Sequence, residues 1–237
     1  MDPLLLVLHE DDDLLVVHKP AGLVCHPTKG DARSSLISRL RLHRGGGFGA
    51  LVNRLDRETS GVTLAAKSPG AAGELGRLMA ARAITKDYLA LVHGQPAWDA
   101  LTVEAPLGRD EASAVAVKDR VRPDGAAAET RFSVQQRGMR GGRPFALVAA
   151  RPLTGRKHQI RLHLAHAGHP VVGDKLYGHD PGCYLRLVRG ELTAADRAAL
   201  LLENHALHAA RLAFTWRGRD WEFRSEPEPE FRQLAAG

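Results

Sequence analysis

The order of short apolar runs limits what this chain can fold into more than any other feature of the sequence. Strand-like runs come in pairs, and these lie at residues 4–8 and 14–18, 88–92 and 101–105, and 130–135 and 145–151. Helical patterns stand between such groups rather than after every strand, which argues against strict βαβ alternation. We therefore expect an α+β fold with a mixed, largely antiparallel central sheet flanked by helices and loops.

Capping and turn residues indicate where the helices begin and end. Ser68-Pro69 is a good N-cap and first-turn pair, and it predicts a helix to about residue 83. Leu36, Ile37, Leu40 and Arg41 lie at helical spacing within 34–44, and glycines follow. Two further helices and three further strands are expected at 156–167 and 193–203, and at 62–66, 207–216 and 221–224. The polar segment 109–128 predicts an excursion at the edge of the molecule.

Length and composition limit the class of protein. A chain of 237 residues can form one large domain or two small lobes, and none of its apolar runs approaches the length of a membrane span. The first residues read as a strand and not as a signal peptide. Two cysteines cannot build a disulfide framework, so we expect structural thiols and a cytoplasmic location.

Basic residues are concentrated in one window of the chain. Between Thr130 and Gly173 there is no Asp or Glu, whereas eight basic residues occur there, namely Arg131, Arg137, Arg140, Arg143, Arg151, Arg156, Lys157 and Arg161. A stretch of one charge sign is typical of a nucleic-acid surface. An arginine-rich coding bias is the alternative, although it does not explain why acids vanish from this window.

Asp56 is a single carboxylate in a similar setting. It is the first acid after Asp31, and the intervening basic residues are Arg33, Arg39, Arg41, Arg44 and Arg54. Such an acid suits chemistry on a polyanion, because the arginines would hold phosphates and a nearby cation would keep the carboxylate ionised. The alternative is a surface Asp before a Thr-Ser-Gly turn.

The surroundings of Asp56 resemble the active-site loop of the RluA-type RNA pseudouridine synthases, which reads His-Arg-Leu-Asp-x-x-Thr-Ser-Gly before a strand. Residues 53–61 here read Asn-Arg-Leu-Asp-Arg-Glu-Thr-Ser-Gly. Asn53 stands where the family usually has His, a change that bears on loop packing more than on catalysis. Further blocks match in the family's order, and they are His18–Val24, Lys86–Val92, Leu153–Arg161, Gly168–Asp174 with Tyr177-Gly178, and Leu207–Ala209.

The resemblance implies an architecture. We expect residues 1–237 to form a single catalytic domain, with two lobes about a central RNA-binding cleft. The chain would begin directly at the catalytic domain, without the additional N-terminal RNA-binding module that the family often carries. A monomer is the simplest expectation.

The resemblance also implies a chemistry, which is the isomerisation of uridine to pseudouridine. Asp56 matches the catalytic carboxylate, which acts as nucleophile at the sugar or stabilises its positive charge. Arg161 matches the basic partner of that Asp, and Tyr88 matches the active-site tyrosine that stacks on the uracil. The reaction exchanges no electrons, and uracil is a tolerable leaving group, so neither a redox cofactor nor a metal is needed.

Five basic residues are candidates for RNA contacts. Arg54 would fill the gap left by the flipped uridine or contact a phosphate, and Arg57 is its neighbour beyond Asp56. Arg156, Lys157 and His158 at a helix N-terminus would form an anion site. The partner would be structured RNA, either ribosomal or transfer RNA.

Other functions fit the sequence less well. The histidines 163, 166, 169, 205 and 208 lack the spacing of a zinc helix, so a structural or RNA-contacting role is expected. A glycosidase would need a second carboxylate, and Glu58 is an unconvincing one. An RNA-binding protein without catalysis on the same fold remains the main alternative, which replacement of Asp56 would test.

Overall fold

The computed structural model describes residues 5–27, 34–178, 180 and 182–235, so Asp31 and Arg33 lie outside the described residues. The chain divides into two compact units. Residues 1–87 and 208–228 form the first unit, and residues 88–207 and 229–237 form the second. The expected single domain of two lobes around a cleft stays a prediction.

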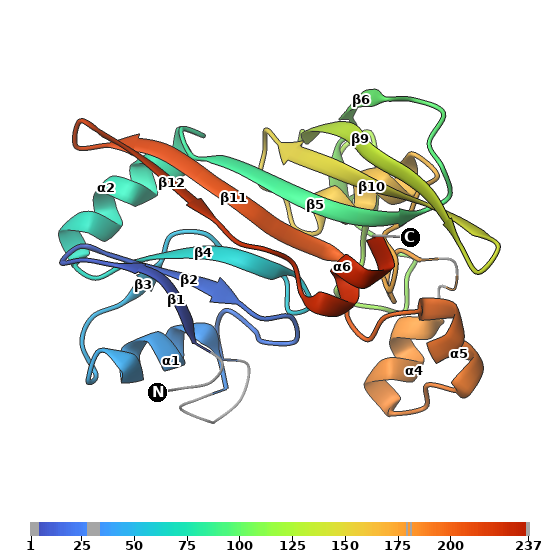
Figure 1. Ribbon diagram of the computed structural model, residues 1–237, viewed down its shortest axis with the longest axis horizontal. Coiled ribbons are helices and arrows are strands. Elements are labelled where there is room, and N and C mark those ends of the chain that lie inside the picture. The colour runs from blue at the N-terminus through green and yellow to red at the C-terminus, as the bar shows by residue number, and fades with distance from the viewer. Residues whose placement is uncertain (1–4, 28–33, 179, 181, 236–237) are drawn as a thin grey trace. The chain divides into compact units, whose positions relative to one another are not determined.

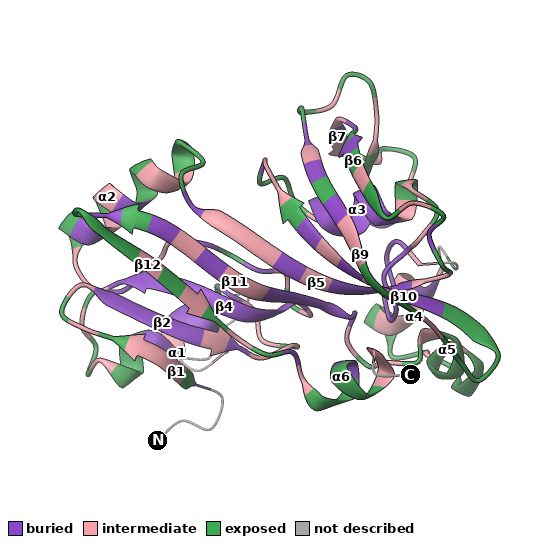
Figure 2. Ribbon diagram, turned by 45° about the horizontal axis from the view of Figure 1, so that its top comes forward, coloured by how far each residue is buried: buried purple, intermediate pink, exposed green. Residues whose placement is uncertain are grey.

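Two buried strands form the centre of the first unit. β2 (Leu14–Lys19) and β4 (Ser60–Ala66) pair antiparallel, and every residue of β4 is buried, as the purple ribbon of Figure 2 shows. Strands buried on both faces read as nearly continuous apolar runs, which both sequences do. Around them lie β1 (Leu6–Glu10) antiparallel to β2, β11 (Leu207–Trp216) parallel to β4, β3 (Ala50–Leu51) beside β4, and β12 (Arg219–Arg224) antiparallel to β11 (Figure 1).

Two helices of the first unit begin at serine N-caps. Ser35 caps α1 (Leu36–His43) and Ser68 caps α2 (Pro69–Ala80), each accepting a hydrogen bond from the amide three residues on. Leu36, Ile37 and Leu40 of α1 are buried as expected, but Arg41 is exposed. The apolar core combines residues of α2 and of the sheet, among them Leu14, Leu64, Leu75 and Leu212.

The second unit contains an antiparallel sheet. Its strands follow the order β5 (Thr85–His93), β10 (Arg143–Pro152), β9 (Glu129–Arg140) and β6 (Ala100–Glu104). The helices of this unit are α3 (Gln159–His166), α4 (Cys183–Arg189), α5 (Ala194–Leu200) and α6 (Pro229–Ala235). A small core cluster includes Leu107, Leu162, Leu176 and Tyr177.

The structure confirms the α+β fold with a mixed, largely antiparallel sheet. Some details differ. The first strand lies two residues further on than predicted, and the segment 109–128 contributes to a short hairpin of β7 (Leu107–Arg109) and β8 (Asp119–Val121). The short helices α4 and α6 were not predicted. Within the described residues, no helix combines the length and apolar character that crossing a membrane requires.

Candidate active site

Asp56 lies in the loop between β3 and β4. The Asp56 carbonyl accepts the Thr59 amide at 3.2 Å, which closes a turn. Leu55 and Thr59 are buried, Asp56 is half-buried, and Arg54 and Arg57 are exposed. The loop thus places one carboxylate between two exposed arginines along the chain, a combination suited to contact with a phosphate backbone.

The side chain of Asn53 extends the strand pairing at the base of this loop. Its Oδ1 accepts the Leu64 amide at 2.8 Å, and its Nδ2 donates to the Val62 carbonyl at 3.2 Å. A carboxamide carries the donor and acceptor of a peptide group, so the buried Asn53 acts as one more peptide of the β3–β4 pair. The residue that replaces the usual His therefore has a defined packing role.

Cys25 holds the residue that precedes Asp56. Its Sγ donates to the Leu55 carbonyl at 3.4 Å and accepts the Leu55 amide at 3.3 Å. Burial raises the pKa of the Cys25 thiol, against a smaller opposing effect of the Leu55 contact. A buried, neutral thiol is typical of a structural cysteine. Cys183 is likewise a buried free thiol.

Lys19 holds the residue that follows Asp56. Its side chain is fully buried, and its Nζ donates to the carbonyls of Pro20 at 2.8 Å, Leu23 at 2.8 Å and Arg57 at 3.0 Å. These three bonds use all three ammonium hydrogens. Burial lowers the pKa of Lys19 to about 8, and nearby negative charge, including that of Asp56, opposes the shift. The ammonium is thus part of the loop's framework.

The end of the loop is joined to β11. Ser60 and Gly61 lie in register with His208 and Ala209 of that parallel strand. Gly61 has φ +115°, and a Cβ there would lie 2.2 Å from the Ala209 carbonyl oxygen. Only glycine tolerates both the backbone conformation and this approach. The Ser60 Oγ contacts His208 Nδ1 at 2.8 Å and donates to Glu228 Oε2 at 2.6 Å.

In the second unit, Arg161 of α3 forms a buried ion pair with Asp174. Its Nε and Nη2 donate to the two carboxylate oxygens at 2.7 and 2.8 Å, and the amides of Leu176 and Tyr177 donate to Asp174 Oδ1. Burial raises the pKa of Asp174, but the Arg161 charge and these hydrogen bonds outweigh it and hold the pKa well below its usual range. The carboxylate therefore stays ionised and holds the guanidinium in one orientation.

Tyr88, also in the second unit, is 9% exposed and lies on β5 opposite Ala150 of β10. Asp56 belongs to the first unit, whereas Tyr88 and Arg161 belong to the second. Within the second unit, Arg161 pairs with Asp174. The catalytic set of Asp56, Tyr88 and Arg161 stays a prediction.

The expected anion site before α3 is built differently from the sequence prediction. The helix begins at Gln159, because His158 adopts a left-handed conformation with φ 56°. The Gln159 Oε1 accepts the Arg156 amide at 2.9 Å, which closes the turn that precedes the helix.

The three basic residues of this segment have partners within the unit. Arg156 Nε donates to the Ala127 carbonyl, Lys157 lies 3.0 Å from Asp119, and His158 Nδ1 lies 2.8 Å from the Tyr177 hydroxyl. Their RNA contacts stay a prediction, and RNA would have to compete with these bonds.

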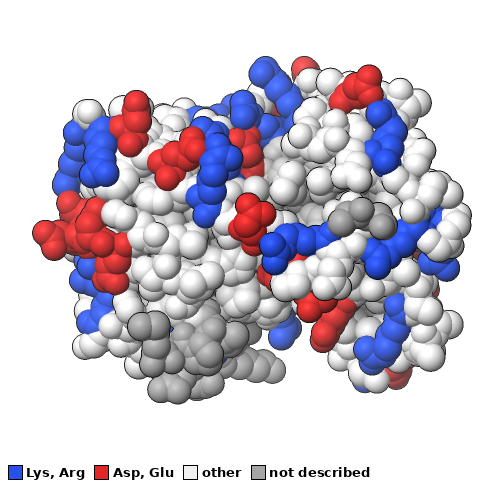
Figure 3. All heavy atoms as spheres, viewed as in Figure 1, with Lys and Arg blue, Asp and Glu red and all other residues white. Residues whose placement is uncertain are grey.

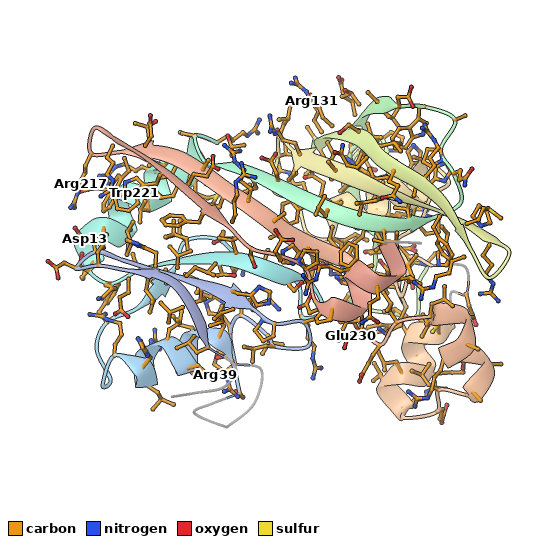
Figure 4. All side chains as sticks on the ribbon, in the orientation of Figure 1. Asp13, Arg39, Arg131, Arg217, Trp221 and Glu230 are labelled. Atoms are coloured by element: carbon orange, nitrogen blue, oxygen red, sulfur yellow. The ribbon has the colours of Figure 1, made fainter. Side chains whose placement is uncertain are left out.

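The segment from Thr130 to Gly173 contains no acidic residue, but acidic residues from elsewhere in the chain lie next to its arginines. Arg137 pairs with Asp99, and Arg131 lies 3.8 Å from Glu129. Figure 3 shows basic and acidic side chains interspersed on the visible face, and Figure 4 labels Arg131 together with Arg217 and Asp13, which pair at 2.7 Å in the first unit. A run of one sign along the chain therefore does not define a surface of one sign.

His163 has structural contacts. His163 is buried and contacts Thr130 Oγ1 at 2.9 Å and the Ala105 carbonyl at 3.0 Å, and burial lowers its pKa. Among the described residues, no group of three or more His, Cys, Asp or Glu is arranged to hold a metal ion.

Sequence reasoning missed the residues that hold the Asp56 loop. Lys19 and Ser60 belong to matching blocks, which was the one available signal, but their contacts were not foreseen. Glu228 reaches Ser60 across 168 positions, and no local pattern indicates such a contact.

A family model described as RNA pseudouridylate synthase matches residues 13–166, from the start of β2 to the end of α3. The chain belongs to this family. The match includes Asp56, Tyr88 and Arg161, and the resemblance to the RluA-type synthases is confirmed.

Relatives within the family share much of the chain. Ribosomal large subunit pseudouridine synthase C of Salmonella typhi is 39% identical over 214 residues, which are 90% of this chain and 63% of the relative. The protein of the same name from Pasteurella multocida is 41% identical over 172 residues, 73% of this chain and 52% of the relative. The chain thus spans less than two thirds of the length of these relatives.

Solved structures show the same fold. Human RNA Pseudouridylate Synthase Domain Containing 1 has a TM-score of 0.76 and 29% identity, covering 95% of this chain and 84% of the other. Human RNA Pseudouridylate Synthase Domain Containing 4 has a TM-score of 0.73 at 24% identity, covering 98% and 93%. The second likeness concerns the fold alone.

Proposed function

We propose that the protein is an RNA pseudouridine synthase, an isomerase that converts uridine in structured RNA to pseudouridine. The observation that carries the proposal is that the Asp56 loop, inside the matched family region, is held by the buried side chains of Asn53, Cys25, Lys19 and Ser60. Preorganisation of this kind is what a catalytic carboxylate requires, because small displacements of a reacting group are costly.

The chemistry needs three functions from the chain. Asp56 acts at the ribose carbons, as nucleophile or as counter-charge to the developing positive charge. Arg161 serves as the cation that keeps the Asp56 carboxylate ionised. Tyr88 stacks on the detached uracil so that the base is retained. Arg54 and Arg57, exposed on either side of Asp56, bind the RNA backbone or occupy the place of the flipped uridine.

Ribosomal RNA is the proposed substrate. Two relatives are named as synthases of the large ribosomal subunit, which supports this choice over transfer RNA. In a bacterium this substrate is consistent with the cytoplasmic location expected from the two isolated thiols. Binding of RNA without catalysis is the outcome that the experiment below must exclude.

The test is mass-labelled mapping of pseudouridine in total rRNA and tRNA from cells that lack the gene. The cells are complemented with wild type, with Asp56→Asn, or with Asp12→Asn, which removes an exposed acid of the same unit. We expect one or a few rRNA uridines to lose modification, and wild type and Asp12→Asn to restore it. In vitro, Asp56→Asn should lower the rate by about 10⁴-fold or more. Restoration by Asp56→Asn would reject catalysis, and a lost tRNA site would correct the substrate.

A further inference from the structure

A chain of polar groups lies behind the Asp56 loop in the first unit. Glu228 Oε2 accepts the Ser60 hydroxyl at 2.6 Å, and Ser60 Oγ lies 2.8 Å from His208 Nδ1. His208 Nε2 lies 2.9 Å from the Ser225 carbonyl oxygen. Ser60 is 2% exposed and His208 is fully buried, so their polar atoms depend on partners within the protein.

The hydrogen-bonded groups Glu228, Ser60, His208 and Ser225 have fewer donor hydrogens than contacts when His208 is neutral. Three contacts need three hydrogens, but the Glu228 carboxylate and the Ser225 carbonyl can only accept. The Ser60 hydroxyl supplies one hydrogen and a neutral His208 ring supplies one more. With a neutral ring, one contact therefore brings two acceptors together at less than 3 Å. All three hydrogen bonds can form together only when this group of side chains holds one additional proton.

The additional proton belongs on His208. Glu228 is stabilised as a carboxylate, because the Ala21 amide donates to its Oε1 at 3.1 Å and His18 Nε2 lies 3.8 Å away. Burial raises the pKa of Glu228, but the hydrogen bonds from His18, Ser60 and the backbone outweigh it and lower the pKa to about 2. With the carboxyl ionised, both ring nitrogens of His208 must donate.

The groups around the His208 ring shift its pKa in opposite directions. Burial is the largest influence and brings the pKa of His208 below its usual value, and the neighbouring His18, with ring centroids 5.8 Å apart, lowers it further. The Ser225 carbonyl and the charges of Glu228 and Glu226 raise it. Lys19 is a nearby cation that interacts with Glu228. The carboxylate of Glu228 is thus the group that most directly supports a charged ring through Ser60.

We propose that Glu228 is a positioning residue for the Asp56 loop, acting with a protonated His208 to hold Ser60 through a hydrogen-bonded chain. Its two oxygens join the end of the loop at Ser60 to the backbone at Ala21. The Ala21 segment also includes two of the three carbonyl acceptors of Lys19, those of Pro20 and Leu23. When His208 loses its proton, one of the three hydrogen bonds is lost and Ser60 is held less firmly. This inference rests on the proposed function, since the loop's role is to place Asp56.

Glu228→Gln separates charge from contact. A glutamine keeps Oε1 for the Ala21 amide and offers Nε2–H to Ser60 Oγ, so that Ser60 donates to a neutral His208 and the ring donates to Ser225. The variant therefore completes the chain without the additional proton. Glu228→Ala removes both contacts, and Glu226→Gln removes an exposed charge of the same segment without a contact to Ser60.

The first measurement is an NMR titration of labelled histidine in the full-length protein. We expect the pKa of His208 to be higher in wild type than in Glu228→Gln by at least about one unit, and to fall by clearly less in Glu226→Gln, whose charge has the smaller effect on the ring. In Glu228→Gln the neutral ring should carry its proton on Nε2. Equal pKa values in wild type and Glu228→Gln would overturn the proton assignment. This measurement does not depend on catalysis, so it stands even if the proposed function fails.

The second measurement is the pH dependence of kcat on rRNA prepared from cells that lack the gene. Wild-type kcat should fall as pH rises through the pKa of His208, and Glu228→Gln should lack that decline. Glu228→Ala should lower kcat by about 10-fold to 100-fold at all pH values with little change in KM. A wild-type profile shared by all three variants would overturn the positioning role. Activity in Asp56→Asn would instead reject the proposed function.

Discussion

The two units hold their candidate catalytic groups by different means. Around Asp56, the anchoring side chains of Asn53, Cys25 and Lys19 bond to main-chain amides and carbonyls of the loop and its neighbours. Arg161 is instead held through its own charged group by the buried carboxylate of Asp174. Anchoring the backbone positions a group indirectly, whereas an ion pair orients the guanidinium itself.

This difference has an energetic consequence. Hydrogen bonds to the main chain contribute about 1 kcal/mol each, so the loop's stability is divided among several contacts. In a buried ion pair more depends on each partner, because loss of Asp174 would remove a carboxylate that balances the buried Arg161 charge. Single substitutions should therefore cost more at the Arg161 pair than at any one anchor of the Asp56 loop.

Asp174→Asn should produce the largest loss of stability. The substitution leaves the Arg161 charge buried, and we expect the free energy of unfolding to fall by about 3–5 kcal/mol. Urea unfolding measures the effect. The control is Asp180→Asn, which removes a surface partner of Arg186 that is 53% exposed and should change the stability little. The double variant Arg161→Met/Asp174→Leu should recover part of the loss. A small effect of Asp174→Asn would remove the contrast between the units.

Gly61→Ala tests how closely the backbone of the first unit is packed. A Cβ at Gly61 would meet the Ala209 main chain, and the residue has positive φ, so we expect a loss of about 2–4 kcal/mol. Gly76 of α2 is the matched control, because a Cβ there meets nothing within 4 Å. Gly76→Ala should stabilise the helix by about 0.5–1 kcal/mol. Thermal unfolding distinguishes the two, and equal effects would refute the close approach.

Local patterns in the sequence predicted elements with strong signals. The strand Leu207–Trp216 and the helix begun by Ser68-Pro69 lie where alternation and capping place them. The start of α3 was wrong by three residues, because His158 takes a left-handed conformation and Gln159 bonds back to the Arg156 amide. A side-chain contact of that kind cannot be read from periodicity.

The framework of the site was less accessible to sequence reasoning than the fold. The family blocks pointed to Asp56, Tyr88 and Arg161, but not to what holds them. Burial of Lys19 depends on three carbonyls brought together by tertiary folding, and Arg161 has an acid thirteen positions on as its partner. Such pairings depend on topology, which a single sequence determines only through the complete fold.

Lys19 provides a pH test of the first unit, since it is a buried charge within a framework of main-chain contacts. Its pKa is about 8 in the folded state and 10.5 as a model value, so the unfolded chain binds more protons between these values. The stability contribution of Lys19 should therefore rise with pH from about 8 to about 10.5, by up to roughly 3 kcal/mol. The measurement is the difference in unfolding free energy between wild type and Lys19→Met across this range. Lys157→Met, at a half-exposed side chain, controls for removal of a surface lysine. If the difference between wild type and Lys19→Met did not change with pH, the lowered pKa of Lys19 would be wrong.

Substitutions of Asn53 should have the smallest effects and compare the family's alternatives directly. Asn53→Ala leaves the Leu64 amide and the Val62 carbonyl without the side-chain partner, which should cost about 1–3 kcal/mol. Asn53→Asp keeps the acceptor but directs a carboxylate at the Val62 carbonyl. Asn53→His offers one donor and one acceptor when neutral, so it should retain more stability than either. Urea unfolding near pH 8, where an ordinary histidine is neutral, ranks the three. If alanine were the best tolerated, the peptide-like role of Asn53 would be wrong, and the loop would depend on its other anchors alone.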